Sequence, residues 1–149
     1  MSDEPGAAVF HFSKLTQTAL AAMCRLGEAY GTHRMSAFAI ADASQLRRPI
    51  VAKVLTDLAR AGLVGGARGP GGGYQLTRPP EQITLGEIVG LYDKRPTFLE
   101  DECPLGVKGC RWSGQCPLRV QQVLFQSQLQ LLLEENSLHS LTDRTCHPG

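Results

Sequence analysis

The chain has 149 residues, enough for one domain or for one domain with an appended helix. Its 42% hydrophobic and 19% charged residues are typical of a globular protein and exclude an intrinsically disordered one. No apolar run is long enough to span a membrane, and the acidic start MSDEPGAAVFHF is unlike a signal peptide, so we expect a cytoplasmic protein.

Basic residues are unevenly distributed along the chain, although its formal net charge is only +1. Residues 11–78 hold nine Lys and Arg against three acids, whereas the rest of the chain holds six bases and eleven acids. A basic first half suggests a polyanionic partner. Bases spread around a solvated face would give the same count.

Two helices are predicted at the start of the basic half. Apolar residues at intervals of three and four predict a helix over residues 13–30, which Gly31 can end. Ser36 can cap a short second helix over residues 37–43. We expect Phe38, Ile40 and Ala41 of this helix to face a core.

A third helix and a hairpin should follow. After a break at residues 44–47, the segment 48–61 has an apolar stripe formed by Ile50, Val54, Leu58 and Ala61, and Pro49 suits its first turn. The short apolar pieces at 63–64 and 74–76 then flank a glycine-rich turn. Such a pattern predicts a small β-hairpin with a flexible, charged tip.

The second half of the chain should contain two more helices around an irregular segment. Thr84 and Glu87 have capping-box spacing, which predicts a short helix within residues 83–93. Residues 94–115 lack a regular pattern, and Pro117 then opens a long helix over residues 117–135. Glutamines rather than charged residues separate two apolar stripes on this helix, which favours contact with a second copy over packing on its own core alone. The stripes are Leu118, Phe125, Leu129 and Leu132, and Val120, Leu124 and Leu131.

Three helices followed by a hairpin predict a winged helix-turn-helix, whose third helix enters the major groove of double-stranded DNA. In that fold Arg47, Arg48, Pro49 and Ile50 open the recognition helix, and Lys53 lies one turn further on. The arginines can reach a phosphate or a guanine edge, and Lys53 suits a phosphate. A solvated helix start would usually mix charges of both signs, but no acid occurs from residue 43 to residue 56.

The hairpin tip adds a second predicted DNA contact. Arg68 could enter the narrow minor groove, where the negative potential is enhanced. The glycines beside it, beginning with Gly69, allow positive φ angles and a close approach of the backbone to phosphate. Glycines needed only for turning would not account for Arg68.

Three motifs of the sequence occur together in one known family: RGPGGGY at 68–74, LARAGLV at 58–64 and SKLTQTAL at 13–20. By these motifs the sequence resembles the Rrf2 family of bacterial transcription regulators. The resemblance implies a homodimer of winged-helix domains that are joined by long C-terminal helices and bind a dyad-symmetric operator. It also implies a repressor, not an enzyme, which has no small-molecule substrate and senses iron, nitric oxide or redox state through an iron–sulfur cluster.

Cys103, Cys110 and Cys116 fall where members of that family bind the cluster. Thiolates are the main ligands of iron–sulfur clusters, and the absence of CxxC pairs fits a zinc finger poorly. Two alternatives stay open, namely zinc or another metal, and redox chemistry of the thiols in a cluster-free regulator. An iron–sulfur electron carrier would leave the basic helix unexplained.

The fourth ligand of such a cluster is less clear from the sequence. Some relatives supply a histidine three residues after the last cysteine, but Arg119 occupies that position here. Others use an acidic residue of the partner subunit's first helix, where this chain has Gln17, and His11 is near that position. Three cysteines with a weak or exchangeable fourth ligand favour a 4Fe–4S cluster over a 2Fe–2S cluster.

These interpretations give a mainly α fold with a small β-hairpin wing, a winged helix-turn-helix plus a long C-terminal dimerisation helix. We expect a flexible tail over residues 1–9 and a DNA-binding domain over 10–80. A linking helix and the cysteine-rich cluster-binding loop should occupy residues 81–116. The dimerisation helix and the C-terminal tail should occupy 117–149.

Overall fold

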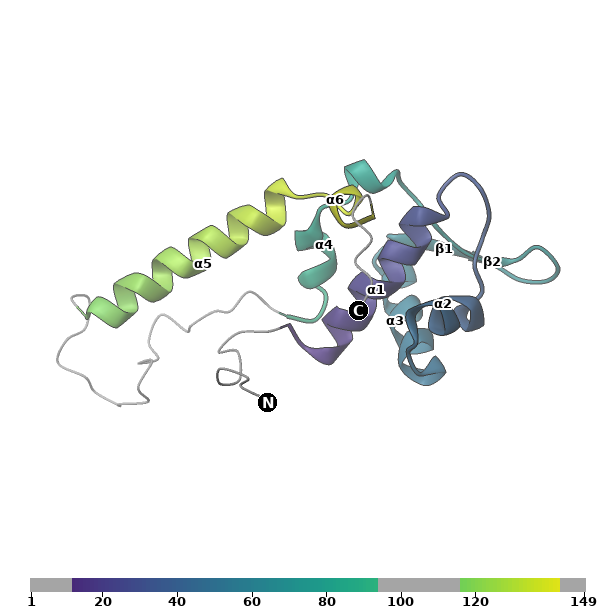
Figure 1. The fold of residues 1–149 in the computed structure, drawn as a ribbon, viewed down its shortest axis with the longest axis horizontal. Coiled ribbons are helices and arrows are strands. Elements are labelled where there is room, and N and C mark those ends of the chain that lie inside the picture. The colour runs from purple at the N-terminus through teal and green to yellow at the C-terminus, as the bar shows by residue number, and fades with distance from the viewer. Residues whose placement is uncertain (1–11, 94–115, 143–149) are drawn as a thin grey trace, which may run out of the picture.

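A computed structural model describes residues 12–93 and 116–142 of the chain. It confirms the predicted fold, which is mostly helical with one two-stranded antiparallel hairpin. The hairpin and the first three helices form one end of the molecule, and a long helix, α5, extends away from it (Figure 1).

Three helices form the centre of the compact part: α1 (Lys14–Glu28), α2 (Ala37–Ser44) and α3 (Arg48–Arg60). Serine side chains cap both α1 and α2, where Ser13 accepts the Thr16 N–H and Ser36 accepts the Ala39 N–H. The cap at Ser36 was predicted from the sequence. The break between α2 and α3 contains Gln45 in the left-handed conformation, with φ of 55°. This residue ends α2 and turns the chain into the recognition helix, α3.

The core lies between these three helices and also includes residues of the hairpin, of the segment 83–88 and of the segment after residue 135. α1 contributes Ala22, Met23 and Leu26, and each has at most 1% of its surface exposed. The buried threonines of α1 were not foreseen as core residues, but the hydroxyl of Thr18 donates to the carbonyl oxygen of Lys14 at 2.8 Å, so its burial leaves no unpaired donor.

The wing is formed by β1 (Val64–Ala67) and β2 (Gly73–Leu76), which pair antiparallel with Val64 opposite Leu76. Its base is joined to the segment before α2 by two backbone hydrogen bonds. The Met35 N–H donates to the carbonyl oxygen of Tyr74 at 3.0 Å, and the Tyr74 N–H donates to that of Met35 at 2.7 Å. The wing is therefore fixed at its base to the entrance of the helix-turn-helix.

Two short elements follow the wing, η1 (Pro80–Gln82) and α4 (Leu85–Val89). The predicted capping box is present: the Glu87 N–H donates to the Thr84 hydroxyl, and the Thr84 N–H donates to the Glu87 carboxylate. Ile83 and Ile88 are fully buried, so this segment belongs to the core of the winged-helix part rather than to a separate linker.

The end of the described chain returns to the same core. After α5 (Pro117–Glu135), Leu138 is fully buried and α6 (His139–Thr142) packs on α1. Backbone hydrogen bonds from Leu85 to Asn136 and from Leu138 to Ile83 fix the junction. Residues 136–142 are therefore more than the expected C-terminal tail. Their packing has no local signal in the sequence, because Leu138 is a single apolar residue without a periodic pattern.

Two expectations about the core were wrong. Phe38 is 52% exposed, because α2 buries Ile40, Ala41 and Ser44, and at about 100° per residue Phe38 lies about 160° around the helix from Ile40. On α3 the predicted stripe was right for Val54 and Leu58, which are buried together with Val51 and Leu55. Ile50 is half-buried and Ala61 is exposed, so the prediction was wrong for Ala61.

Candidate nucleic-acid interface

The first turn of the recognition helix presents the predicted DNA contacts to solvent. Arg47, Arg48, Pro49 and Lys53 are exposed, whereas Ile50 is half-buried and packs against the core. The buried residues of α3 set this orientation. Val51, Val54, Leu55 and Leu58 face the core, so the opposite side of the helix faces solvent. The helix thus has one apolar face and one basic face.

The arginines of this surface have no acidic partner within the parts of the chain that the structure describes. Ion pairs there engage Arg25, Lys53, Arg78 and His139, but not Arg47, Arg48 or Arg68. A guanidinium without an internal carboxylate is available to a phosphate or a base edge. Lys53 differs, since its ammonium lies 3.4 Å from the Asp57 carboxylate, although 59% of its side chain is exposed.

The tip of the wing places Arg68 and Gly69 in solvent at the far end of the hairpin. Gly69 has φ of 87°, a conformation that L side chains rarely adopt, and its carbonyl oxygen accepts the Gly72 N–H at 2.8 Å. At the base, Gly73 has φ of 123°, and an added Cβ would lie 2.8 Å from the Met35 carbonyl. Glycine is thus required at the tip and at the base of the wing.

A hydrogen-bond network joins the recognition helix to the end of α4. The Tyr92 hydroxyl donates to the Asp57 carboxylate at 2.8 Å, and Lys53 approaches the same carboxylate oxygen. The Tyr92 hydrogen bond, followed by Lys53, holds the pKa of Asp57 below its ordinary value. Burial and the adjacent carboxylate raise the pKa of Tyr92, so its hydroxyl stays protonated. No local pattern in the sequence indicates this pair, because its members lie 35 positions apart.

The predicted metal ligands lie mainly outside the described residues. Cys103, Cys110 and His11 are among these. Cys116 is described as a free, half-buried cysteine at the N-cap of α5, and Gln17 is exposed on α1, its amide nitrogen donating to the Phe12 carbonyl oxygen at 2.8 Å. Within residues 12–93 and 116–142 no three His, Cys, Asp or Glu side chains gather at metal-binding distance.

Comparison with known proteins identifies the family. The Rrf2 family profile, described as an iron-dependent transcriptional regulator, matches residues 12–144. The chain belongs to the Rrf2 family. Rrf2 proteins regulate transcription and are not enzymes, so the predicted family and the predicted DNA-binding, non-enzymatic class are confirmed. None of the helices described is long and apolar enough to cross a membrane.

Individual Rrf2 relatives match over part of their length. The regulator IscR of Cereibacter sphaeroides is 38% identical over 64 residues, which are 43% of this chain and 41% of that protein. IscR of Aliivibrio salmonicida is 29% identical over 101 residues, 62% of this chain and 58% of that protein. The chain spans about two fifths of the length of several curated relatives that it matches.

Solved structures of Rrf2 regulators resemble the fold over nearly its whole length. CymR, the global cysteine regulator of B. subtilis, has a TM-score of 0.75 and 26% identity, covering 92% of this chain and 99% of that chain. IscR of T. potens has a TM-score of 0.73 and 22% identity, covering 93% and 90%, and shows the fold.

Replacing Arg68 by Ala should weaken binding to duplex DNA and lower the slope of log affinity against log salt by about one, because one phosphate-neutralising charge is lost. Fluorescence anisotropy at several salt concentrations measures both quantities. Lys14→Ala is the matched control, since Lys14 is an exposed base at the start of α1, away from the wing (Figure 1). Unchanged affinity in the Arg68 variant would remove the wing from the interface.

Replacing Tyr92 by Phe should lower the free energy of unfolding by about 1 kcal/mol at pH 7, since the Asp57 carboxylate loses a donor. A carboxyl group with a lowered folded-state pKa contributes stability above its unfolded pKa and loses it as the pH falls through the folded one. The difference between variant and wild type should therefore shrink below about pH 4. Urea denaturation measures it, with Tyr30→Phe as the control, because within the described chain no hydrogen bond engages the Tyr30 hydroxyl.

Proposed function

We propose that this Rrf2 protein is a homodimeric repressor whose affinity for a dyad-symmetric operator is set by an iron–sulfur cluster bound to Cys103, Cys110 and Cys116. The observation that supports DNA binding is the set of exposed arginines on the recognition helix and wing, none of which pairs with an acidic side chain of residues 12–93 or 116–142. The sensing half rests on the three thiols of the sequence and on the position of Cys116 at the start of α5.

The recognition helix and the wing would contact different grooves of the DNA. Arg47 and Arg48 would meet base edges or phosphates in the major groove, and Arg68 would reach the adjacent minor groove. Ile50 packs the first turn of α3 against the core, and Pro49 restricts the backbone of that turn, so the arginines are presented from a rigid element. Lys53, which shares Asp57 with Tyr92, is suited to a phosphate.

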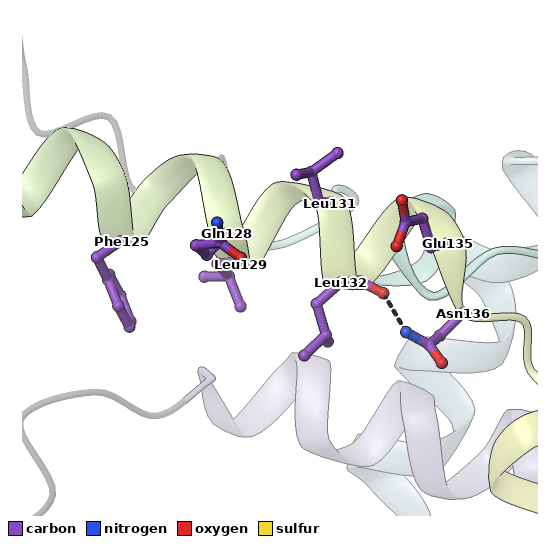
Figure 2. A pocket seen from close by; sticks show the side chains of 7 residues that line it. All are labelled: Phe125, Gln128, Leu129, Leu131, Leu132, Glu135 and Asn136. Carbon is purple, nitrogen blue, oxygen red and sulfur yellow. Dashed lines mark hydrogen bonds between the residues drawn. The ribbon is translucent and has the colours of Figure 1, made fainter.

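The surface of α5 supports the dimer. None of its residues is buried, and seven large apolar side chains are exposed along it. An open hollow of about 410 Å³ lies beside the helix. Figure 2 shows Phe125, Leu129 and Leu132 pointing to one side of the helix and Leu131 to another. A contiguous apolar surface of this kind is typical of an interface. A second copy fits because the helix would bury the same stripes against their symmetry mates.

The donor set fits an iron–sulfur cluster. Three thiols are soft ligands, and the Cys116 side chain caps no N–H group of α5 although it occupies the N-cap position. The first N–H groups of a helix without a side-chain cap remain free to donate to thiolate or sulfide. Gln17 keeps its amide oxygen free of hydrogen bonds within the described chain, which leaves it and His11 as proposed fourth ligands. When bound, the cluster supplies a centre that reacts with oxidants and nitric oxide, and we favour 4Fe–4S over 2Fe–2S.

Contacts at both ends of the 94–115 segment offer a route from cluster to operator. On one side Tyr92 is bonded to the recognition helix and Asp93 accepts the Ser13 N–H at 2.9 Å. On the other side Cys116 opens α5, which would join the two subunits. A rearrangement of the thiols would therefore shift the dimer helix relative to α3 and alter half-site spacing. A coupling of about 1–3 kcal/mol changes affinity about 5- to 150-fold.

A cluster-free regulator that binds zinc or uses redox-sensing thiols is the second candidate. The similarity to CymR supports this second candidate. CymR is named as a global cysteine regulator, and its fold matches 92% of this chain. Both candidates share the DNA-binding surface and the dimer helix. They differ in what the three cysteines hold.

Protein purified without oxygen should be brown, with a broad absorption band near about 400 nm, if thiolates bind an iron–sulfur cluster. Operator affinity at fixed salt should differ at least fivefold between loaded and apo protein. Cys103→Ala, Cys110→Ala and Cys116→Ala should each abolish the band, whereas Cys24→Ala on α1 is the control. A colourless protein that contains zinc would favour the second candidate, and equal affinities would contradict cluster sensing.

Replacing Leu124 by Glu should convert the dimer to monomers, because each copy would place a charge in an apolar interface. The dissociation constant should rise at least about tenfold, as expected for the loss of one buried leucine contact per copy. Sedimentation velocity over a range of concentrations measures it. Gln126→Glu is the control, since residue 126 lies about 160° around α5 from Leu124. A Leu124 variant that dimerises like wild type would contradict this interface.

A further inference from the structure

Phe38 is an exposed aromatic residue on the part of the molecule that reads DNA. Among the described residues, ten large apolar side chains are exposed, and seven of them lie on α5. The other three are Tyr30, Phe38 and Leu91, of which only Phe38 belongs to the helix-turn-helix. A phenylalanine with half its surface in water gains only part of the stabilisation that full burial would give. The exposed part of this ring is open to contact with a neighbouring side chain.

The Phe38 ring carries the guanidinium of Arg48. The central guanidinium carbon lies 4.0 Å from the ring centroid, which is within the range of a cation–π contact. Arg48 is the first residue of α3, and no acidic side chain of the described chain pairs with it. The five N–H donors of a guanidinium lie in its own plane, so a ring beneath that plane leaves them free for another acceptor.

The Phe38–Arg48 pair lies between the two elements that should touch the duplex. Met35 pairs with Tyr74 at the base of the wing, and Ser36 caps α2 immediately before Phe38. Arg48 approaches the ring from the other side, from the first turn of the recognition helix. Figure 1 places α2 and the wing at the same end of the molecule, opposite α5. The stacked guanidinium is thus held on the DNA-facing side.

We propose that Phe38 is a positioning residue that orients Arg48 to read one guanine of the operator half-site. The ring restricts the guanidinium to one plane, and the free N–H edge donates to O6 and N7 of the guanine. This inference rests on the proposed DNA-binding function and adds a specific base and a specific supporting residue to it. A ring that only shields the aliphatic stem of Arg48 would affect overall affinity, but not the reading of the base.

The test uses the operator selected from random duplexes by the wild-type protein. Each guanine in a half-site is replaced in turn by 7-deazaguanine, which lacks the N7 acceptor, and affinity is measured by anisotropy. In wild type one position should show a penalty of about fivefold, and Arg48→Ala should abolish the penalty at that position. In Phe38→Leu, which keeps apolar bulk without a π face, the same penalty should fall about two- to fivefold. Phe38→Tyr should retain it.

The possible results distinguish failure of the Phe38 inference from failure of the proposed DNA-binding function. A Phe38→Leu protein that binds more weakly but keeps the full 7-deazaguanine penalty would overturn the inference, as would a wild-type protein with no penalty that depends on Arg48. Selection of no sequence by wild type would instead contradict the proposed function itself. Binding to random duplex at low salt should be equal for wild type, Phe38→Leu and Phe38→Tyr, which checks that the variants are folded. A loss of this binding in both variants would also overturn the inference.

Discussion

Burial of one face of α3 is the constraint on which the rest of the structure depends. Val51, Val54, Leu55 and Leu58 are all fully buried, so the helix has one rotational setting in which its apolar residues leave water. Because the helical repeat fixes the angle between residues, this setting also determines where the basic residues point. Arg48 and Lys53 are therefore exposed as a consequence of core packing.

The same core joins segments that lie far apart in the described chain. Ile83 and Ile88 from the segment around α4, and Leu138 from beyond α5, are fully buried against residues of the helix-turn-helix. One end of α5 is thus anchored to the DNA-reading unit, while the helix itself buries none of its residues. A long helix that is anchored at one end and apolar along its length is suited to transmit the arrangement of the proposed dimer to two recognition helices.

Polar contacts refine this arrangement at two places on the recognition helix. At its start, Arg48 lies over the Phe38 ring, and near its end Asp57 accepts the Tyr92 hydroxyl. We propose that the first contact orients a side chain toward DNA. The second joins the helix to the residues that precede the 94–115 segment. α3 therefore carries both the arginine proposed to read a base and the connection to the proposed sensor.

Local information in the sequence determined most of the secondary structure. The caps at Ser36 and Thr84, Pro49 in the first turn of α3 and the glycines of the wing act within a few residues of their own position, so their patterns can be read directly. The exposure of Arg47, Arg48 and Arg68 also followed from the sequence, since charges without nearby acids rarely enter a core. The family resemblance added the expected role of the cysteines.

Only the tertiary structure decided which faces and which distant residues meet. Phe38 was expected in the core, but burial of Ile40 and Ala41 turns it outward, because a short helix has room for one buried side. Leu138 and the Tyr92–Asp57 contact had no local signal, since each depends on how remote segments pack. Sequence periodicity specifies that a helix has a buried face, whereas its rotation and its partners are set by the volume that the whole core must fill.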